Sequence, residues 1–404
     1  MPRSPMNARS TGHLLQDLSL ASIMRYLPLE AVKETLADTQ RQSIRRRLLP
    51  SDVVVYLVVM LGLYSDASVR ENLRILMEPL RRQFGTKAVG VPTGAAITKA
   101  RRRLGSAPLM GLFDALAQPV STVKTPEAFY HGFRVVAVDG ATVDIQDTKA
   151  NRDRFGIHTN QHGPVGYPQI KVVIMVECGS RVPLGCAYDG GDVYEPGLFD
   201  ALVPKLTKDM LLLADRAYYD FARWQACAKR AGTLLWRVKN NLNLPPISIL
   251  EDGSYLAEIR PSHKLTKSGK SIKGEVCVVR VMEYCPLFAD GTQGEQVRLM
   301  TTLLDARQAP AEELCNLFTR RWEVESGFDE FKTHLRGPQR VLRSQVPELV
   351  EQELYGFLLA YTVVRLTMTE AARHQRCPPR ELSFIHTVRV IRRRIAFPPD
   401  DQIR

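Results

Sequence analysis

The segment Phe133–Asp139, FRVVAVD, is an apolar run that ends in an acidic residue and is followed by Gly140. A second run, Met210–Asp215 with the sequence MLLLAD, has the same form. Short apolar runs of this kind are typical of strands in a sheet covered on both faces. We expect Asp139 and Asp215 to end two such strands, where open α/β sheets bind their ligands.

Further strands are predicted on either side of these two runs. They have the sequences TVDI (142–145), QIKVVIMVE (169–177), RVPLGCAY (181–188) and TLLWRV (233–238). Helices are predicted from Glu195 to Leu206 and from about Phe221 to Arg230. Three or more strands, a helix, a strand, a helix and a strand predict an α/β core with one mixed sheet.

The rest of the chain divides by pattern into helical and β-rich parts. Residues 1–125 read as an all-helical N-terminal domain, and residues 126–239 as the first part of the α/β core. Residues 240–308 contain helix-poor pieces such as EVCVVRVMEY (275–284) and read as a β-rich insertion. Residues 309–345 complete the core with a helix that Pro310 opens, and residues 346–404 form a C-terminal helical region.

Charge and cysteine usage narrow the functional class. A net charge of +12 and a pI near 9.4 favour a polyanionic partner, nucleic acid above all. The seven cysteines include no Cys-x-x-Cys pair, which argues against a zinc module and a disulfide framework. The N-terminus lacks the apolar core of a signal peptide, and Val53–Leu63 is too short to span a bilayer. We expect a cytoplasmic protein with no membrane role.

Basic residues gather in several places that could contact phosphate. Arg101, Arg102 and Arg103 lie on a predicted helix that ends at Gly105, and a lysine-rich segment covers 263–274. A second arginine cluster covers 41–47. Solvated helix faces and a charged flexible loop are the alternative interpretations.

The third acid of the predicted site comes from the helix after Pro310. At about 100° per residue, Arg321, Glu325 and Lys332 fall on one side of the segment NLFTRRWEVESGFDEFKTHL (316–335). Cleaving a phosphodiester bond needs an activated water and relief of charge on phosphorus, which two divalent ions held by a few carboxylates provide. An ordinary surface ladder of Arg321 and Glu325 is the alternative. The rival acids are Asp144, Asp147, Glu323, Asp329 and Glu330.

These residues together resemble a known family. The spacing Phe318-x2-Arg321-x3-Glu325-x6-Lys332 is similar to the Tyr-Arg-Glu-Lys signature of insertion-sequence-four-type DDE transposases, with Phe in place of Tyr. The blocks VAVDGATVD (136–144) and LLLADRAYYD (211–220) resemble its two aspartate regions. The segment from LSLASIMRYLPLEAV to SVRENLRILMEPL resembles its N-terminal domain. The resemblance covers nearly the whole chain.

The resemblance implies a ribonuclease-H-like catalytic core with a β-rich insertion. It implies Asp139, Asp215 and Glu325 as catalytic, metal-binding acids for two Mg²⁺ ions, with Mn²⁺ as a substitute. Phe318, Arg321 and Lys332 would contact DNA, residues 1–125 would form the domain that binds DNA ends, and residues 126–239 would form the first part of the catalytic core. The implied activity is cut-and-paste DNA transposition of a bacterial insertion sequence, with double-stranded element ends and target as partners. A homodimer in the DNA complex and association with the nucleoid are also implied.

Two other functions fit the same residues. One is an inactive DNA-binding relic or regulator derived from a transposase, which the lost Tyr hydroxyl at Phe318 would favour. The other is a host metal nuclease built on the same core, which inverted repeats around the gene would exclude.

Overall fold

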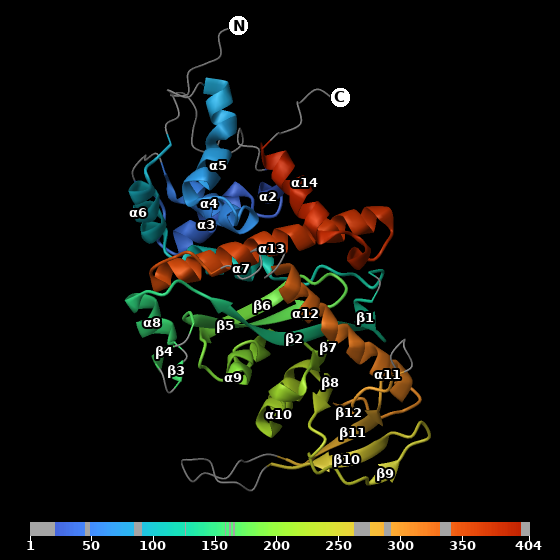
Figure 1. Ribbon diagram of the computed structural model, residues 1–404. Helices are drawn as coiled ribbons and strands as arrows, with labels where there is room; N and C mark the ends of the chain where they lie inside the picture. Colours follow the sequence, from blue (N-terminus) through green and yellow to red (C-terminus); the bar gives the residue numbers. More distant parts are fainter. Residues whose placement is uncertain are drawn as a thin grey trace.

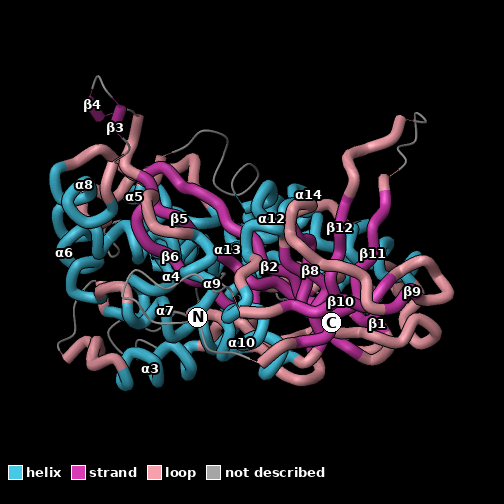
Figure 2. Tube along the Cα trace, turned by 90° about the horizontal axis from the view of Figure 1, so that it is seen from below, coloured by secondary structure: helices cyan, strands magenta, loops and turns pink. Residues whose placement is uncertain are grey.

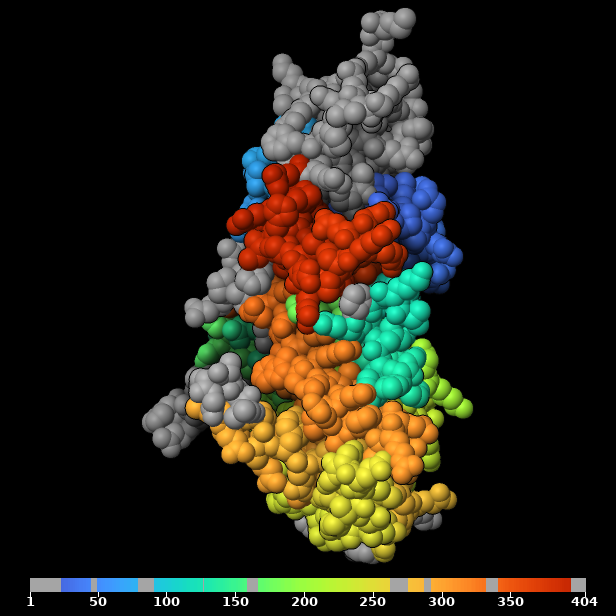
Figure 3. Space-filling model, turned by 90° about the vertical axis from the view of Figure 1, so that its right-hand side faces the viewer, coloured from blue at the N-terminus to red at the C-terminus, as the bar shows by residue number. Residues whose placement is uncertain are grey.

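The computed structural model describes residues 21–44, 49–84, 91–125, 127–157, 159–160, 163–164, 166–261, 275–286, 292–331 and 341–396 of the 404-residue chain. The molecule is elongated: N-terminal helices occupy one end, a long helix crosses the middle and a large sheet follows (Figure 1). From the side, the segment around residue 320 lies on the surface between the C-terminal helices and the strands near residue 250 (Figure 3).

One mixed sheet runs through the described part of the chain. Its strand order is β6-β5-β2-β7-β8-β12-β11-β10-β9, and β1 pairs with β2 off this path. The pairs β2–β7 and β7–β8 are parallel, and the others are antiparallel. The expected α/β class is confirmed, with β6-β5-β2-β7-β8 as the ribonuclease-H-like part. The strands are β1 Phe129–Tyr130, β2 Phe133–Asp144, β5 Gln169–Glu177, β6 Pro183–Gly190, β7 Met210–Ala214, β8 Thr233–Val238, β9 Ser248–Ile249, β10 Tyr255–Ile259, β11 Cys277–Tyr284 and β12 Val297–Thr301, with a separate hairpin of β3 Thr159–Asn160 and β4 Gly163–Pro164.

The central strands are rich in apolar residues because both faces of the sheet are covered. Side chains alternate along a strand, so neighbouring residues enter different cores. Val135 and Leu213 belong to one hydrophobic cluster, and Val136 and Leu212 to the other. The first cluster includes helices of both chain ends, and the second is covered by α9 (Glu195–Asp200) and α10 (Phe221–Ala231).

Strand β2 is longer than its sequence suggests. We expected a strand ending at Asp139 and a second one at 142–145, but β2 continues through Gly140 to Asp144. Its pairing with β5 extends to Asp144↔Gln169, whereas its pairing with β7 ends at Ala137↔Leu213. Asp139 therefore lies within β2, just beyond the point where the parallel ladder stops.

The N-terminal part is helical, as predicted. Helix α4 is buried at all of its residues because it lies inside a ring of other helices. Thr93 caps α6 by accepting from the Ala96 amide, and Gly105 ends it with φ +72°. The helices are α2 Ala21–Met24, α3 Leu29–Asp38, α4 Ser51–Leu63, α5 Val69–Phe84, α6 Gly94–Leu104 and α7 Ala107–Leu116.

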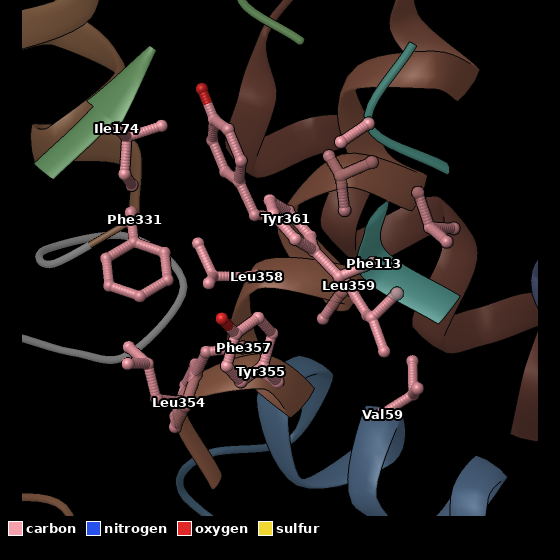
Figure 4. Close-up of a cluster of buried hydrophobic side chains, with 14 of the residues drawn as sticks. Val59, Phe113, Ile174, Phe331, Leu354, Tyr355, Phe357, Leu358, Leu359 and Tyr361 are labelled. Atoms are coloured by element: carbon pink, nitrogen blue, oxygen red, sulfur yellow. The ribbon is translucent and has the colours of Figure 1, made fainter. Parts of the chain in front are cut away.

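Helix α13, Pro347–Gln375, separates the N-terminal helices from the sheet. Its side chains meet Val59 of α4 on one side and Ile174 of β5 and Phe331 on the other (Figure 4). One hydrophobic cluster therefore joins the N-terminal helices, α13 and one face of the sheet. The remaining helices are α8 Lys149–Phe155, α11 Ala311–Phe318, α12 Trp322–Asp329 and α14 Phe384–Ala396, with 3₁₀ turns η2 Val203–Lys205, η3 Arg216–Tyr218, η4 Thr319–Arg321 and η6 Pro379–Glu381.

The predicted β-rich insertion extends the core sheet. Strand β12 pairs with β8 in the register Met300↔Trp236, and β11, β10 and β9 follow outward. Seen from below, these strands gather at one end of the molecule, opposite α8 (Figure 2). The lysine-rich segment at 263–274 lies outside the described residues.

In the ranges that the structure describes, no helix combines the length and the apolar character that a membrane span needs.

Candidate functional site

The parallel pairing of β2 with β7 brings Asp139 next to Asp215. Ala137 and Leu213 form the last aligned pair of this ladder, and each acid lies two residues further along its strand. Asp215 keeps an extended backbone, with φ −80° and ψ 167°, so the alternation continues past the end of β7. Both carboxylates are thus directed to the face of the sheet that α12 covers.

Helix α12 supplies the third acid over the same face. Val324 and Phe328 pack into the cluster that contains Ala137, which fixes the helix above β2. The guanidinium of Arg321 then contacts two of the acids through one nitrogen: Nη1 lies 2.7 Å from Glu325 Oε1 and 3.6 Å from Asp139 Oδ2. Asp139, Arg321 and Glu325, which the sequence analysis assigned to one site, are therefore neighbours in space.

The helix after Pro310 begins where predicted but is not uniform. Helix α11 is followed by the 3₁₀ turn η4, which ends at Arg321, and then by α12. Lys332 and residues up to 340 lie outside the described residues, so the predicted role of Lys332 remains a prediction. Gly327 of α12 lies close to a side chain of α13: a Cβ there would stand 3.0 Å from the Tyr361 hydroxyl oxygen. This close approach of α13 explains the glycine.

Burial disfavours the ionised form of the Asp139 carboxyl. Burial raises the pKa of this carboxyl to about 6. A hydrogen bond from the Gly140 amide (2.9 Å) and the charge of Arg321 lower this pKa in part, whereas Glu325 and Glu195 raise it. Asp139 is still mostly ionised at neutral pH, which a metal ligand requires.

The donor set fits a hard divalent cation. Asp215 Oδ1 is buried and has no hydrogen-bond partner among the described residues, so this carboxylate oxygen is available to a ligand. Carboxylate oxygens are the ligands that Mg²⁺ and Mn²⁺ prefer. Within the described segments, no three Asp, Glu, His or Cys side chains yet stand close enough to enclose an ion. The Arg321 guanidinium lies between Asp139 and Glu325, so a shift of this side chain would be needed to bring the two carboxylates around an ion.

The rival acids on β2 and after it have other partners. Asp147 forms an ion pair with Arg152 that lowers the pKa of the Asp147 carboxyl at the surface. Asp144 Oδ1 accepts a hydrogen bond from the side-chain amide (Nε2) of Gln169 at 2.8 Å. Neither carboxylate takes part in the contacts of Arg321.

The rival acids on the helix hold α12 in place. Glu323 accepts a hydrogen bond from the Gly179 amide at 2.8 Å, and burial raises the pKa of its carboxyl. Glu330 contacts Arg181 at 2.8 Å and Arg365 at 3.4 Å, and it is 8% exposed. Both residues bind the turn between β5 and β6, and Glu330 also binds α13, so they support the helix that carries Glu325.

Two aromatic residues flank Arg321. Phe318, which we expected to contact DNA, is only 7% exposed, and its ring centroid lies 5.9 Å from the Arg321 guanidinium carbon. In this conformation Phe318 packs inside the protein and does not form part of the surface. Trp322 lies 5.2 Å from the same carbon and is 60% exposed. Sequence reasoning missed Trp322, although it directly follows Arg321.

The three arginines predicted to bind DNA on α6 have different surroundings. Arg101 is 5% exposed and donates to Gln352 Oε1 (2.7 Å), Ser344 Oγ (3.3 Å) and the Leu349 carbonyl (3.2 Å). It fastens α6 to α13, so the structure does not place it on a DNA-facing surface.

The other two arginines of this group are more accessible. Arg103 is half-buried and donates to the Leu49 carbonyl at 3.0 Å. Arg102 is exposed. In the second predicted cluster, Arg41 is exposed, and residues 45–47 lie outside the described residues.

Two further residues of the site were not predicted. Glu195, the first residue of α9, accepts a hydrogen bond from the Tyr218 hydroxyl at 2.8 Å. Tyr218 is 1% exposed and follows Asp215 by three positions in η3. Burial and the neighbouring carboxylates raise the pKa of Tyr218 well above its ordinary value, so the hydroxyl remains a donor. The signal in the sequence was Gly140, which leaves room for a neighbour next to Asp139.

Comparison with known proteins gives two family matches that together span most of the chain. Residues 17–114 match the family described as "Insertion element 4 transposase N-terminal", and residues 130–363 match "Transposase DDE domain". The second match alone covers more than half of the 404 residues.

Individual relatives agree with these matches. The chain is 29% identical over 379 residues to the transposase InsG of insertion sequence element IS4 from Escherichia coli (strain K12), covering 93% of this chain and 82% of InsG. It is 26% identical over 195 residues to InsZ of the same organism, covering 48% of this chain and 62% of InsZ. Among solved structures, the piggyBac transposase synaptic complex with hairpin DNA aligns at a TM-score of 0.49 with 10% identity, over 94% of this chain and 80% of that one.

Proposed function

Because the chain belongs to the DDE transposase family, with the N-terminal region of the insertion-element-4 type, we propose that Asp139, Asp215 and Glu325 are its metal-binding catalytic acids. The observation that carries this proposal is their placement. Two acids leave adjacent parallel strands on one face, and the third lies on the helix above it, joined to Asp139 through Arg321 Nη1. The rival acids Asp144, Asp147, Glu323 and Glu330 have other partners.

The protein's part in the chemistry is to position charge. Two Mg²⁺ ions, or Mn²⁺ in their place, would supply an activated water and offset charge on the phosphorus. Asp139 and Asp215 hold their carboxylates on a rigid sheet, and Glu325 approaches from α12. Arg321 leaves its carboxylate partners to bind a DNA phosphate, for which its planar, two-pronged donor geometry is suited. Arg321 thus stops neutralising Asp139 and Glu325, where the metal ions would take its place, and contacts the DNA substrate instead.

The reaction sequence follows a cut-and-paste route. Hydrolysis of a phosphodiester bond at the element end leaves a 3′-hydroxyl. This hydroxyl attacks the opposite strand, displaces the flanking DNA and closes a hairpin on the element end. Hydrolysis of the hairpin restores the 3′-hydroxyl, which then attacks target DNA and displaces a target 3′-hydroxyl. Each step exchanges one oxygen on phosphorus for another and needs no redox partner.

The partners in this proposal are double-stranded element ends and target DNA. Joining both ends of an element requires two catalytic sites, which a homodimer in the DNA complex provides. The net charge of +12 and exposed arginines such as Arg102 favour attraction to the DNA backbone, and with it association with the bacterial nucleoid. Lys332 is proposed as a further phosphate contact from the family signature.

Cleavage of labelled element ends in Mg²⁺ tests the proposal. Asp139→Asn, Asp215→Asn and Glu325→Gln should each lower the cleavage rate by about 100-fold or more, because the ions contribute several kcal/mol to transition-state stabilisation. End binding in EDTA should persist in all three variants. Asp147→Asn, which removes a surface acid paired with Arg152, is the matched control and should cleave normally.

Wild-type cleavage rates in any of the three variants would overturn the assignment of that acid. Wild-type protein that binds ends but never cleaves them would instead support the regulator derived from a transposase.

A further inference from the structure

Glu195 lies against the residue that follows Asp139. A Cβ built on Gly140 would stand 2.2 Å from Glu195 Cδ and 2.4 Å from its Oε1, closer than real atoms approach. The carboxylate therefore fills the space that a side chain at position 140 would need. Any residue larger than glycine there would displace Glu195, so the sequence Asp139-Gly140 reserves this place for an acid from α9.

Tyr218 fixes the carboxylate in this place. Its hydroxyl donates to Glu195 Oε1 at 2.8 Å, and its ring is buried against Phe199 of α9 at a centroid distance of 5.7 Å. Tyr218 belongs to the turn η3 that begins directly after Asp215. One hydrogen bond thus connects α9 with the backbone segment that carries the second acid.

Glu195 adds negative charge to a site that already has an excess. Among the described residues it forms no ion pair, and its only hydrogen-bond partner is Tyr218. The electrostatic influence of Glu195 reaches Asp139, and Arg321 is the cation in contact with Asp139 and Glu325. An excess of like charge is costly even with one arginine nearby, and hard divalent cations are bound where carboxylates gather in this way. The Oδ1 atom of Asp215 is buried without a hydrogen-bond partner among the described residues, which leaves it open to a ligand, and Tyr218 lies three positions after Asp215.

We propose that Glu195 is a fourth carboxylate of the divalent-metal site, held in position by Tyr218 and admitted by Gly140. This inference rests on the proposed function of Asp139, Asp215 and Glu325. In it, Glu195 approaches from α9, whereas Glu325 approaches from α12, so helices on both faces of the sheet contribute to holding the cation.

Direct Mn²⁺ titration of the DNA-free full chain, followed by the electron paramagnetic resonance signal of free Mn²⁺, tests the inference without relying on cleavage. Glu195→Gln keeps an oxygen that accepts from Tyr218 but removes the charge, and it should weaken Mn²⁺ binding by about 10-fold. Asp192→Asn, an exposed acid three positions earlier, removes the same charge and should bind Mn²⁺ like the wild type. Tyr218→Phe keeps the carboxylate but releases it, and should weaken binding by a smaller factor.

Cleavage gives a second readout. The Glu195→Gln variant should need more Mn²⁺ for half-maximal cleavage and should recover rate at high Mn²⁺, which a merely structural defect would not produce. Its melting temperature in EDTA should match or exceed that of the wild type, because a repulsive charge has been removed.

The outcomes separate the two proposals. If Asp139→Asn and Asp215→Asn lose Mn²⁺ binding but Glu195→Gln retains wild-type affinity, Glu195 is only a packing residue and this inference is wrong. If Asp139→Asn and Asp215→Asn also bind Mn²⁺ like the wild type, the proposed function itself fails.

Discussion

Asp139 is a single residue of the site whose burial lowers the free energy of unfolding at neutral pH. Its carboxyl is largely buried, shares one guanidinium with Glu325 and has a pKa of about 6 against an ordinary value near 3.8. The raised pKa means that the folded protein favours the protonated acid relative to the unfolded chain. The metal binding that we propose for Asp139 requires the ionised form, which is the form that burial disfavours.

A stability measurement should reveal this cost. Because the folded pKa is raised, stability from Asp139 is greatest below about pH 4 and declines as pH rises to about 6, after which the loss is constant. We expect Asp139→Asn to unfold in EDTA at pH 7 with a free energy of unfolding larger by on the order of 2 to 3 kcal/mol. The gain should disappear near pH 4. Denaturant unfolding at both pH values checks this, and an equal gain at both would contradict the electrostatic origin.

Strands of the core could be predicted where the residues of one segment alone show the apolar pattern of a strand. Strands β7 and β8 are short apolar runs, and the structure confirms them. The end of β2 was misjudged because Asp139 and Gly140 interrupt the apolar pattern, while β5 continues to pair alongside. The pairing of β12 with β8 left no signal either, because a strand's sequence does not state its neighbour. The three candidate acids were chosen from strand ends and the family signature, whereas no residue beside Glu195 in the sequence indicates the role that we propose for it.

The crossing of α4 and α13 depends on glycine. A Cβ at Gly356 would stand 2.6 Å from the Val58 carbonyl oxygen, and one at Gly62 would stand 2.7 Å from the Ala360 Cβ. The two helices approach so closely that neither position has room for a methyl group. This contact places α13 between the N-terminal helices and the sheet.

Adding that methyl group should destabilise the protein. We expect Gly356→Ala to lower the free energy of unfolding by about 1 to 3 kcal/mol, since a backbone carbonyl cannot move aside as a side chain can. Gly94→Ala on α6, where nothing lies within 4 Å, is the control and should be neutral or slightly stabilising. Thermal and denaturant unfolding compare the two, and equal stabilities would show that α4 and α13 are free to separate.

At the scale of the whole molecule, the N-terminal helices and the catalytic sheet are bound together by distant contacts. Arg101 and Gln352 are 251 positions apart, yet their side chains bond at 2.7 Å in a buried site. The sequence identified the three arginines of α6 as one basic group because they are consecutive on one predicted helix. Which of them faces α13 and which faces solvent depends on packing between remote segments, and that could not be predicted.

Separate variants of the two neighbouring arginines should therefore behave differently. Arg101→Ala leaves buried acceptors on α13 without donors, and it should lower the free energy of unfolding by about 2 to 4 kcal/mol. Its affinity for element ends, measured well below the melting temperature, should stay within about twofold of the wild type. Arg102→Ala should keep its stability, bind ends more weakly and reduce the salt dependence of binding by about one phosphate contact. If Arg101→Ala instead weakened end binding and left stability unchanged, Arg101 would be a DNA contact.

The burial of α4 also has a consequence for the synthesis of the chain. All of its residues are covered in the finished molecule, but its partner α13 leaves the ribosome roughly 300 residues later. At 5 to 20 residues per second, about 15 to 60 s pass before α13 is made and can cover its side of this mostly apolar helix. During this interval the side of α4 that α13 will cover is exposed, and a chain truncated before α13 cannot bury that side. Completion of the core is thus tied to completion of translation.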